Sequence, residues 1–122
     1  MPLIVADSGE LQQVFFNIIT NAIHAMQGGG VMHILTRSSD NHKVEIRIAD
    51  TGHGIKKENR TRIFDPLFTT KEVGKGTGLG LSVSYGIVTK HQGTITFETT
   101  TKEESEKTGT TFIITFPAAG KS

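Results

Sequence analysis

The stretch DSGELQQVFFNIITNAIHAM, residues 7–26, decides how this chain folds. On a helix that advances by about 100° per residue, its apolar side chains gather on one broad face, with a narrow polar stripe beside it. The apolar face consists of Leu11, Val14, Phe15, Ile18, Ile19, Ala22, Ala25 and Met26. We therefore predict a helix over residues 8–27 that packs this face against a sheet.

Two asparagines mark the polar stripe of this helix. Asn17 and Asn21 lie four residues apart, so their side chains point the same way, one turn from each other. Asparagine is a poor helix-interior residue because its amide competes for backbone hydrogen bonds. One interpretation is a pair of amide oxygens held for a hard cation, which takes oxygen ligands. The alternative is a solvated helix flank that happens to be rich in asparagine.

The composition bounds the class of protein. At 122 residues, with 35% hydrophobic and 20% charged residues, the chain fits one soluble globular domain. Its 13 basic and 12 acidic residues give no case for nucleic-acid binding by bulk charge. No apolar run approaches the roughly 18 residues of a membrane span, so we expect no membrane contact by this domain. The lack of cysteine excludes disulfides and fits a reducing, cytoplasmic setting.

Alternation of apolar and polar residues predicts the strands. The segments 31–37 and 43–50 are joined by a polar turn, and a hairpin near the end of the chain is expected from 94–100 and 110–116. A short edge strand is expected over 3–6, a short charged helix over 56–63, and a helix over 78–92 that Gly93 caps. The loop 101–109 reads as solvated and is given no function.

The last residue of the second strand breaks the apolar pattern. Asp50 has the same parity as Val44, Ile46 and Ile48, so it should point toward the buried face. A buried carboxylate without partners is costly. One interpretation is an acceptor for an exocyclic amine at the bottom of a pocket. The alternative is an Asx-turn, in which amides of the following TGHG segment satisfy the carboxylate.

A glycine-rich loop precedes the final helix. Residues 65–78 form a long connection, and long loops within compact domains are usually functional lids or disordered. Glycines alternate at 74, 76, 78 and 80, a spacing that matches neither the P-loop nor the Rossmann fingerprint. A helix that opens out of such backbone favours anions such as phosphate. A flexible hinge before an ordinary helix is the alternative.

Four segments in this order resemble the motifs of a known family. They are the asparagine-bearing helix, DTGHGI at 50–55, FDPLFTTK at 64–71 and GKGTGLGL at 74–81. They are similar to the catalytic, ATP-binding domain of sensor histidine kinases, in the superfamily shared with gyrase, Hsp90 and the mismatch-repair ATPases. The resemblance covers about residues 3–116, and four motifs at the right separations are highly specific. It implies a Bergerat-type fold: an α/β two-layer sandwich with a mixed sheet, helices on one face and a mobile ATP lid.

The resemblance implies ATP and Mg²⁺ as cofactors and a role for each matching residue. Asn21 and Asn17 match the asparagine box, with Asn21 the more certain magnesium ligand and Asn17 assisting it or a bridging water. Asp50 matches the acceptor for the adenine amino group. The other positions matched to nucleotide binding are His24, Gly52, Gly54, Ile55, Phe64, Lys71, Gly76, Thr77, Gly78, Leu79 and Gly80.

These matched positions differ in what they would contact. Gly52 and Gly54 match glycines that let the purine lie against backbone, and residues 76–80 match a glycine box whose amides face the phosphates. Lys71 and Lys75 lie on the expected lid, within reach of phosphate oxygens. A solvated histidine is as good an interpretation of His24 as a phosphate contact.

The resemblance implies histidine kinase activity rather than hydrolysis. Hydrolytic members carry a glutamate at the position of Asn17, and an amide cannot take a proton from water. The family's phosphorylated histidine lies on a separate helical hairpin, and no such segment is found in residues 1–122. We therefore expect this domain to be a fragment of a longer sensor kinase, full-length forms of which can be membrane-anchored. The expected partners are the helical-hairpin phosphoacceptor domain and a downstream response regulator.

Two other functions fit the same pocket. An anti-sigma-type serine kinase would use the same fold toward a different protein partner. A non-catalytic nucleotide sensor would bind ATP only to switch a contact. Phosphotransfer to a supplied histidine hairpin would exclude the sensor, and binding to sigma factors or their antagonists would favour the serine kinase.

Overall fold

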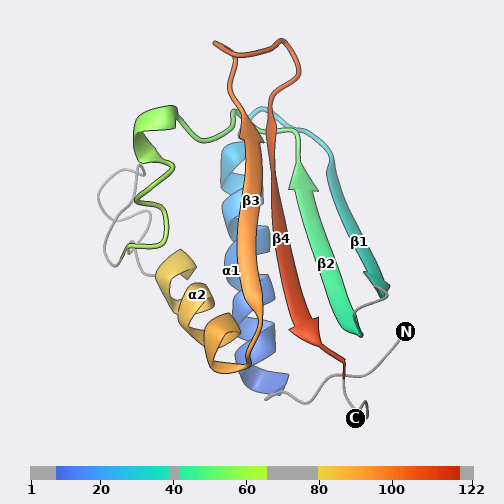
Figure 1. The fold of residues 1–122 in the computed structure, drawn as a ribbon. Helices are drawn as coiled ribbons and strands as arrows, with labels where there is room; N and C mark the ends of the chain where they lie inside the picture. The colour runs from blue at the N-terminus through green and yellow to red at the C-terminus, as the bar shows by residue number, and fades with distance from the viewer. Residues whose placement is uncertain (1–7, 39–41, 66–79, 119–122) are drawn as a thin grey trace.

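The chain folds into two layers, with helices on one face of a four-stranded sheet (Figure 1). The computed structural model describes residues 8–38, 42–65 and 80–118. The helical layer contains α1 (Ser8–Ala25) and α2 (Gly80–Lys90), together with the short 3₁₀ helix η1 (Lys57–Asn59). The strands are β1 (Met32–Ser38), β2 (Lys43–Asp50), β3 (Thr94–Thr100) and β4 (Gly109–Pro117). The expected α/β two-layer sandwich is confirmed.

The sheet has the strand order β1-β2-β4-β3, and each of the described pairings is antiparallel. A mixed sheet was expected, and among the described strands this expectation is wrong. The consecutive strands β1 and β2 form one hairpin, and β3 and β4 form another. Strand β4 pairs with β2, and neighbouring strands run in opposite directions throughout this order. The predicted edge strand 3–6 lies outside the described residues.

The core lies between the sheet and the two helices. Alternate residues of β2 and β4 are buried, as the two-residue period of a strand requires. From α1, Val14 and Ile18 are fully buried, and from α2 Val88 is fully buried. The buried apolar cluster consists of Val14, Ile18, Val44, Ile46, Ile48, Ile63, Val88, Ile95, Phe112, Ile114 and Phe116. The apolar face predicted for the first helix therefore faces the core.

The ends of the elements correct two expectations. At the end of α2, Gln92 rather than Gly93 adopts the left-handed conformation, with φ of 64°. Gly93 is required for a different reason: a Cβ there would collide with the Thr115 carbonyl oxygen and the Phe116 ring. The charged helix expected over 56–63 is reduced to the three-residue η1, followed by turns. Gly29, after α1, takes a left-handed conformation, with φ of 101°.

Several sequence expectations fall outside the described residues. They concern the lid and its phosphate-facing positions: Lys71, Lys75, Gly76, Thr77, Gly78 and Leu79. Within the described ranges, no helix has the length and apolar character needed to cross a bilayer.

Candidate functional site

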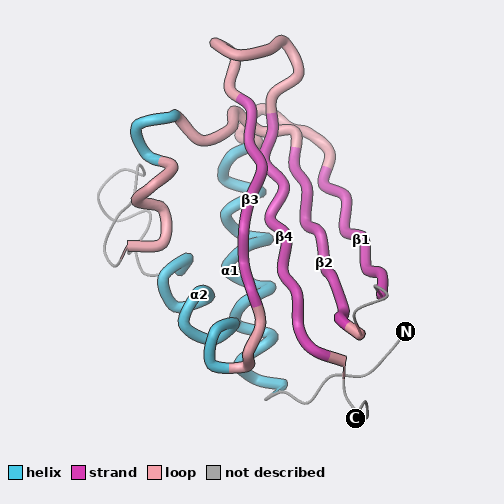
Figure 2. Tube along the Cα trace, in the orientation of Figure 1, coloured by secondary structure: helices cyan, strands magenta, loops and turns pink. Residues whose placement is uncertain are grey.

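Among the predicted site residues that the structure describes, Asp50, Gly52, Gly54 and Ile55 lie together at one end of the sandwich. There α1, β2 and β3 end and β4 begins, and the chain leaves β2 through the turn that leads to η1 (Figure 2). Antiparallel order places the end of β2 beside the start of β4, so Asp50 faces Thr110 across the ladder. The segment 50–55 thus lies between the last turn of α1 and the β3–β4 hairpin.

Asp50 is buried, as its parity in the strand predicts. Asp50 is only 8% exposed, and its Oδ1 accepts a hydrogen bond from the Gly52 N–H at 2.8 Å. Burial raises the pKa of this carboxyl above its ordinary value, and backbone hydrogen bonds from Gly52 and Thr110 oppose that rise. The Asx-turn interpretation is therefore correct for one oxygen, while acceptor capacity remains on the carboxylate, which has about four lone-pair sites.

The turn after Asp50 is attached to the end of α1. The His53 N–H donates to the Ala25 carbonyl oxygen at 3.2 Å, which satisfies one of the free carbonyls of the helix terminus. A Cβ on Gly52 would lie 2.5 Å from that same oxygen. Glycine is thus required at position 52 by contact with the protein's own helix, a reason that the sequence pattern did not indicate.

The next glycine is attached to the hairpin. Gly54 has φ of 80°, and a Cβ there would collide with the Thr100 carbonyl. The following amide, Ile55 N–H, donates to Thr99 Oγ1 at 2.8 Å. Thr99 Oγ1 in turn lies 2.8 Å from Thr110 Oγ1. Threonine side chains of the two hairpin strands therefore support the backbone that follows Asp50.

Asn17 connects the two helices. Its amide nitrogen donates to the Gly80 carbonyl oxygen at 3.0 Å and to Ser84 Oγ at 3.2 Å, at the first turn of α2. Its Oδ1 accepts from the Gln13 amide at 2.9 Å. Ser84 is fully buried and also donates to Gly80. Asn17 thus anchors the start of α2, which directly follows the glycine-rich segment in the sequence.

Asn21 differs from Asn17 in its surroundings. Its side chain is half-buried, and no hydrogen bond to it is found in the part of the chain that the structure describes. It lies one helical turn before Ala25, which contacts the turn 52–53. Asn21 is therefore an available oxygen ligand next to the segment that carries Asp50. His24 lies on the exposed surface of α1.

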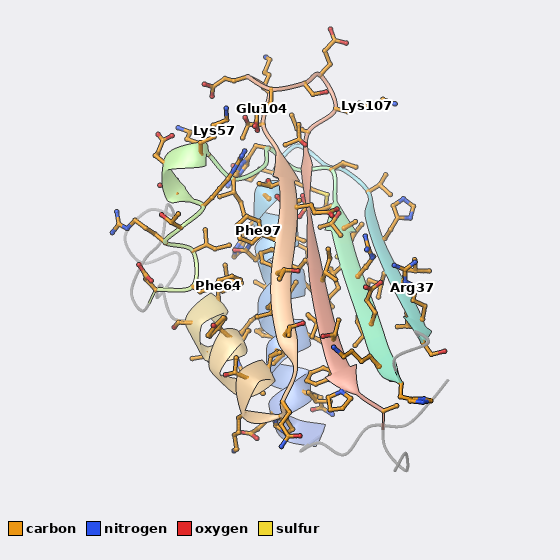
Figure 3. The ribbon with its side chains drawn as sticks, viewed as in Figure 1. Arg37, Lys57, Phe64, Phe97, Glu104 and Lys107 are labelled. Atoms are coloured by element: carbon orange, nitrogen blue, oxygen red, sulfur yellow. The ribbon has the colours of Figure 1, made fainter. Side chains whose placement is uncertain are left out.

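Phe64 belongs to an aromatic cluster between the layers. Its ring centroid lies 6.1 Å from that of Phe97 and 6.5 Å from that of Phe112, both in edge-on arrangements (Figure 3). On its other side, Tyr85 of α2 lies 5.3 Å away. Phe64 thus holds the segment after η1 against both the sheet and α2, and it is the first residue of the FDPLFTTK motif at 64–71.

An ion pair that no sequence pattern indicated lies at this end of the molecule. Arg60 and Glu104 are joined through two hydrogen bonds, and Figure 3 shows the Glu104 side of the hairpin loop facing η1. The Arg60 guanidinium, followed by the Thr101 N–H, lowers the pKa of Glu104 to about 2. The sequence offers no reason to assign a function to the loop 101–109, and the structure shows that its Glu104 contacts Arg60. No sequence signal would have paired the two residues, which are 44 positions apart.

A metal ion at this end would rely on amide and ligand oxygens. Within the described ranges, no three His, Asp or Glu side chains lie close enough to hold a metal. The amide of Asn21, which has no hydrogen-bond partner among the described residues, fits a hard cation such as Mg²⁺, which commonly keeps waters and is bound through few protein groups plus phosphate oxygens.

Comparison with known proteins agrees with this geometry. Residues 6–120 match the family model described as histidine kinase-, DNA gyrase B-, and HSP90-like ATPase. Over 91% of its length the chain is 43% identical to Sporulation kinase A of Bacillus subtilis (strain 168), and over 96% it is 41% identical to Sporulation kinase E of the same strain. It spans 17% and 15%, respectively, of these two relatives.

Solved structures show the same fold. The mycobacterial sensor histidine kinase MprB superposes with a TM-score of 0.82 at 26% identity, which covers 94% of this chain and 76% of that one. The catalytic domain of histidine kinase ThkA superposes with a TM-score of 0.78 at 34% identity, which covers 94% and 70%. With the family model matching almost the whole chain, this protein belongs to the family of histidine kinase-, DNA gyrase B- and HSP90-like ATPases, as an ATP-binding domain of the sensor histidine kinase type.

Proposed function

We propose that this domain binds Mg–ATP beside the end of α1 and supplies its γ-phosphate to a histidine on a separate helical-hairpin domain. The observation that carries the proposal is Asp50, a carboxylate buried at the end of β2 with acceptor capacity beyond its backbone hydrogen bonds from Gly52 and Thr110. Burying a charge is costly unless the charge is paired or hydrogen-bonded. Adenine, which presents an exocyclic amine, is the ligand whose donor matches this acceptor.

Base selection follows from the same carboxylate. The Asp50 oxygen that does not accept from Gly52 would accept from the adenine amino group. Guanine carries a carbonyl oxygen at that position, which would set two acceptors against each other. Sites built to hydrogen-bond a substrate group reject analogues that lack it. The turn 52–55 forms the neighbouring wall, because its glycines allow the backbone to approach α1 and β3 closely.

The phosphates and metal belong to the side of the site formed by α1 and the start of α2. Mg²⁺ would be held by Asn21 and by phosphate oxygens and would neutralise phosphate charge during transfer. Asn17 would contribute chiefly by fixing the first turn of α2. We assign phosphate contacts to Lys71 and to Gly76, Thr77, Gly78, Leu79 and Gly80, with His24 as a further candidate.

Position 17 carries no side chain that could act as the general base for hydrolysis. At position 17 an amide stands bonded to Gln13 and to Gly80, so it cannot serve as a base for water. Phosphoryl transfer depends mainly on positioning and charge neutralisation, which this arrangement can supply. The proposed partners are a phosphoacceptor hairpin and a response regulator, in the cytoplasm.

The proposal is tested by nucleotide binding and then by transfer. The chain should bind Mg–ATP in preference to Mg–GTP, and Asp50→Asn, which adds a donor to the acceptor, should weaken that preference. With γ-labelled ATP and a purified histidine-containing hairpin from a sensor kinase, acid-labile, base-stable label should appear on the hairpin.

Each rival predicts a different result. Tight ATP binding with no label on any hairpin would favour a nucleotide sensor, and acid-stable label on a serine of an added sigma-factor antagonist would favour the serine kinase. Equal affinity for ATP and GTP in the unmodified chain would contradict the role of Asp50.

A further inference from the structure

The backbone of Ile55 is held at both of its polar groups. Its N–H donates to Thr99 Oγ1 at 2.8 Å, and its carbonyl oxygen accepts from Arg60 Nε at 2.9 Å. Thr99 belongs to β3, whereas Arg60 follows η1. The last residue of the turn that begins at Asp50 is therefore fixed from two sides.

Arg60 is itself fixed by the β3–β4 hairpin. Its Nη2 donates to Glu104 Oε1 at 2.5 Å and its Nη1 to Glu104 Oε2 at 3.3 Å, in the two-pronged arrangement that gives arginine–carboxylate pairs their geometric specificity. The exposed fraction is 24% for the Arg60 side chain and 27% for the Glu104 side chain. Lys57 approaches the same carboxylate only at 3.9 Å and is 75% exposed, so it contributes little.

Glu104 also fixes its own loop. Its Oε1 accepts from the Thr101 N–H at 3.0 Å and from the Thr101 hydroxyl at 3.1 Å. Thr101 is buried and directly follows Thr100, against whose carbonyl Gly54 is packed. A continuous chain of contacts thus runs from the hairpin loop through Glu104 and Arg60 to the exit of the turn 50–55.

We propose that Arg60 and Glu104 are positioning residues that hold the turn 50–55 in the conformation that presents Asp50 to the base. The inference rests on the proposed function, because it takes the turn to be a wall of the nucleotide site. The described hydrogen bonds join Arg60 to Ile55 and Glu104, and Glu104 to Arg60 and Thr101; both residues therefore act through Ile55 and the hairpin. The low pKa of Glu104 means that the pair stays charged at neutral pH, so it acts as a fixed support.

The test uses substitutions that remove one partner at a time from the 122-residue chain. Arg60→Gln and Glu104→Gln should each raise the dissociation constant for Mg–ATP about fivefold, which corresponds to about 1 kcal/mol, and should reduce the ratio of ATP to GTP affinity. The double variant should be no weaker than either single one, because the two residues act as one unit. Matched controls are Lys102→Gln and Glu103→Gln in the same exposed loop, which should leave both quantities unchanged.

Base discrimination separates positioning from general stabilisation. If the pair only stabilises the fold, the variants will unfold at lower temperature while the folded protein keeps its ATP affinity and its ATP-to-GTP ratio, and the proposal is then wrong. Amide exchange should also rise at 52–57 and 101–104 together in both variants; a rise confined to one segment would contradict the coupling.

Two further comparisons separate a variant that does not fold, a failure of the positioning role and a failure of the proposed function. If Arg60→Gln does not fold, Arg60→Lys retains the charge but loses the fork, and it should still lower base discrimination. If Asp50→Asn alters discrimination whereas the pair variants do not, the positioning role fails and the proposed function stands. If the unmodified chain shows no ATP preference, the proposed function fails first.

Discussion

At the scale of single residues, the proposed site contains polar groups whose positions do not favour the stability of the fold. Asp50 carries a charge into a buried position, and Asn21 holds a half-buried amide without a described partner. Apolar residues at either position would suit the surrounding core better. Polar groups that are kept where burial disfavours them are characteristic of functional sites.

Removal of the Asn21 amide tests the metal contact. Asn21→Ala leaves the apolar face of α1 intact, so the fold should survive, while affinity for Mg–ATP should fall about tenfold through loss of one good ligand. Titration calorimetry with and without a chelator checks this, because the difference between variant and parent should vanish for metal-free ATP. Gln12→Ala, an exposed position on the same helix, is the control. A deficit that persists without Mg²⁺ would show that Asn21 contacts the nucleotide directly or supports the fold.

The free energy of unfolding should depend on pH through the titration of Asp50. Because burial raises its pKa in the folded state, the native protein holds this proton to higher pH than the unfolded chain does. Stability from this group is complete below the unfolded pKa, near 4, and is lost as the pH rises through the folded value. The free energy of unfolding of nucleotide-free parent, relative to Asp50→Asn, should therefore decrease from about pH 4 upward. Denaturant melts across this range, with Glu103→Gln as control, measure it; a constant difference would mean that Asp50 is not penalised by burial.

At the scale of elements, the turn 50–55 is the part on which the others converge. Its amides and glycines contact the end of α1 through Ala25 and the end of β3 through Thr99 and Thr100. Its exit is held by Arg60. The segment 51–55, which has no regular secondary structure, is thereby held by α1, β3 and Arg60.

Two glycines with opposite surroundings test this description. Gly54→Ala introduces a Cβ at φ of 80° against the Thr100 carbonyl and should cost more than the roughly 1–2 kcal/mol of a left-handed residue alone. Gly86→Ala, inside α2 with no atom within 4 Å of the new Cβ, should stabilise by about 0.5–1 kcal/mol. Chemical denaturation of both variants measures the difference. A well-tolerated Gly54→Ala would mean that the turn adjusts easily and is not fixed by its neighbours.

At the scale of the whole molecule, the proposed binding site lies at one end of the hydrophobic core. The buried faces of β2 and β4 end at Asp50 and Thr110, respectively. Anything that binds Asp50 therefore binds only the folded sandwich, since the unfolded chain brings none of α1, β2 and β3 together.

Ligand binding should consequently raise global stability. At a Mg–ATP concentration 100 times its dissociation constant, the free energy of unfolding should rise by about 2.7 kcal/mol, and the same concentration of Mg–GTP should raise it less. Differential scanning fluorimetry over a nucleotide series measures the effect, and Asp50→Asn should show similar shifts for the two nucleotides. Equal shifts from ATP and GTP in the parent chain would contradict base selection at Asp50.

The sequence by itself determined the elements, the layer that each face turns toward and the burial of Asp50, because these follow from periods of 3.6 and 2 residues that neighbouring residues carry. Alternation along β2 was enough to place Asp50 inward. Tertiary structure alone decided the anchoring of α2 by Asn17, the packing of Gly52 and Gly54 against protein backbone, and the Arg60–Glu104 pair. These contacts join residues many positions apart, so their partners are set by strand order and helix placement, and no local pattern encodes them.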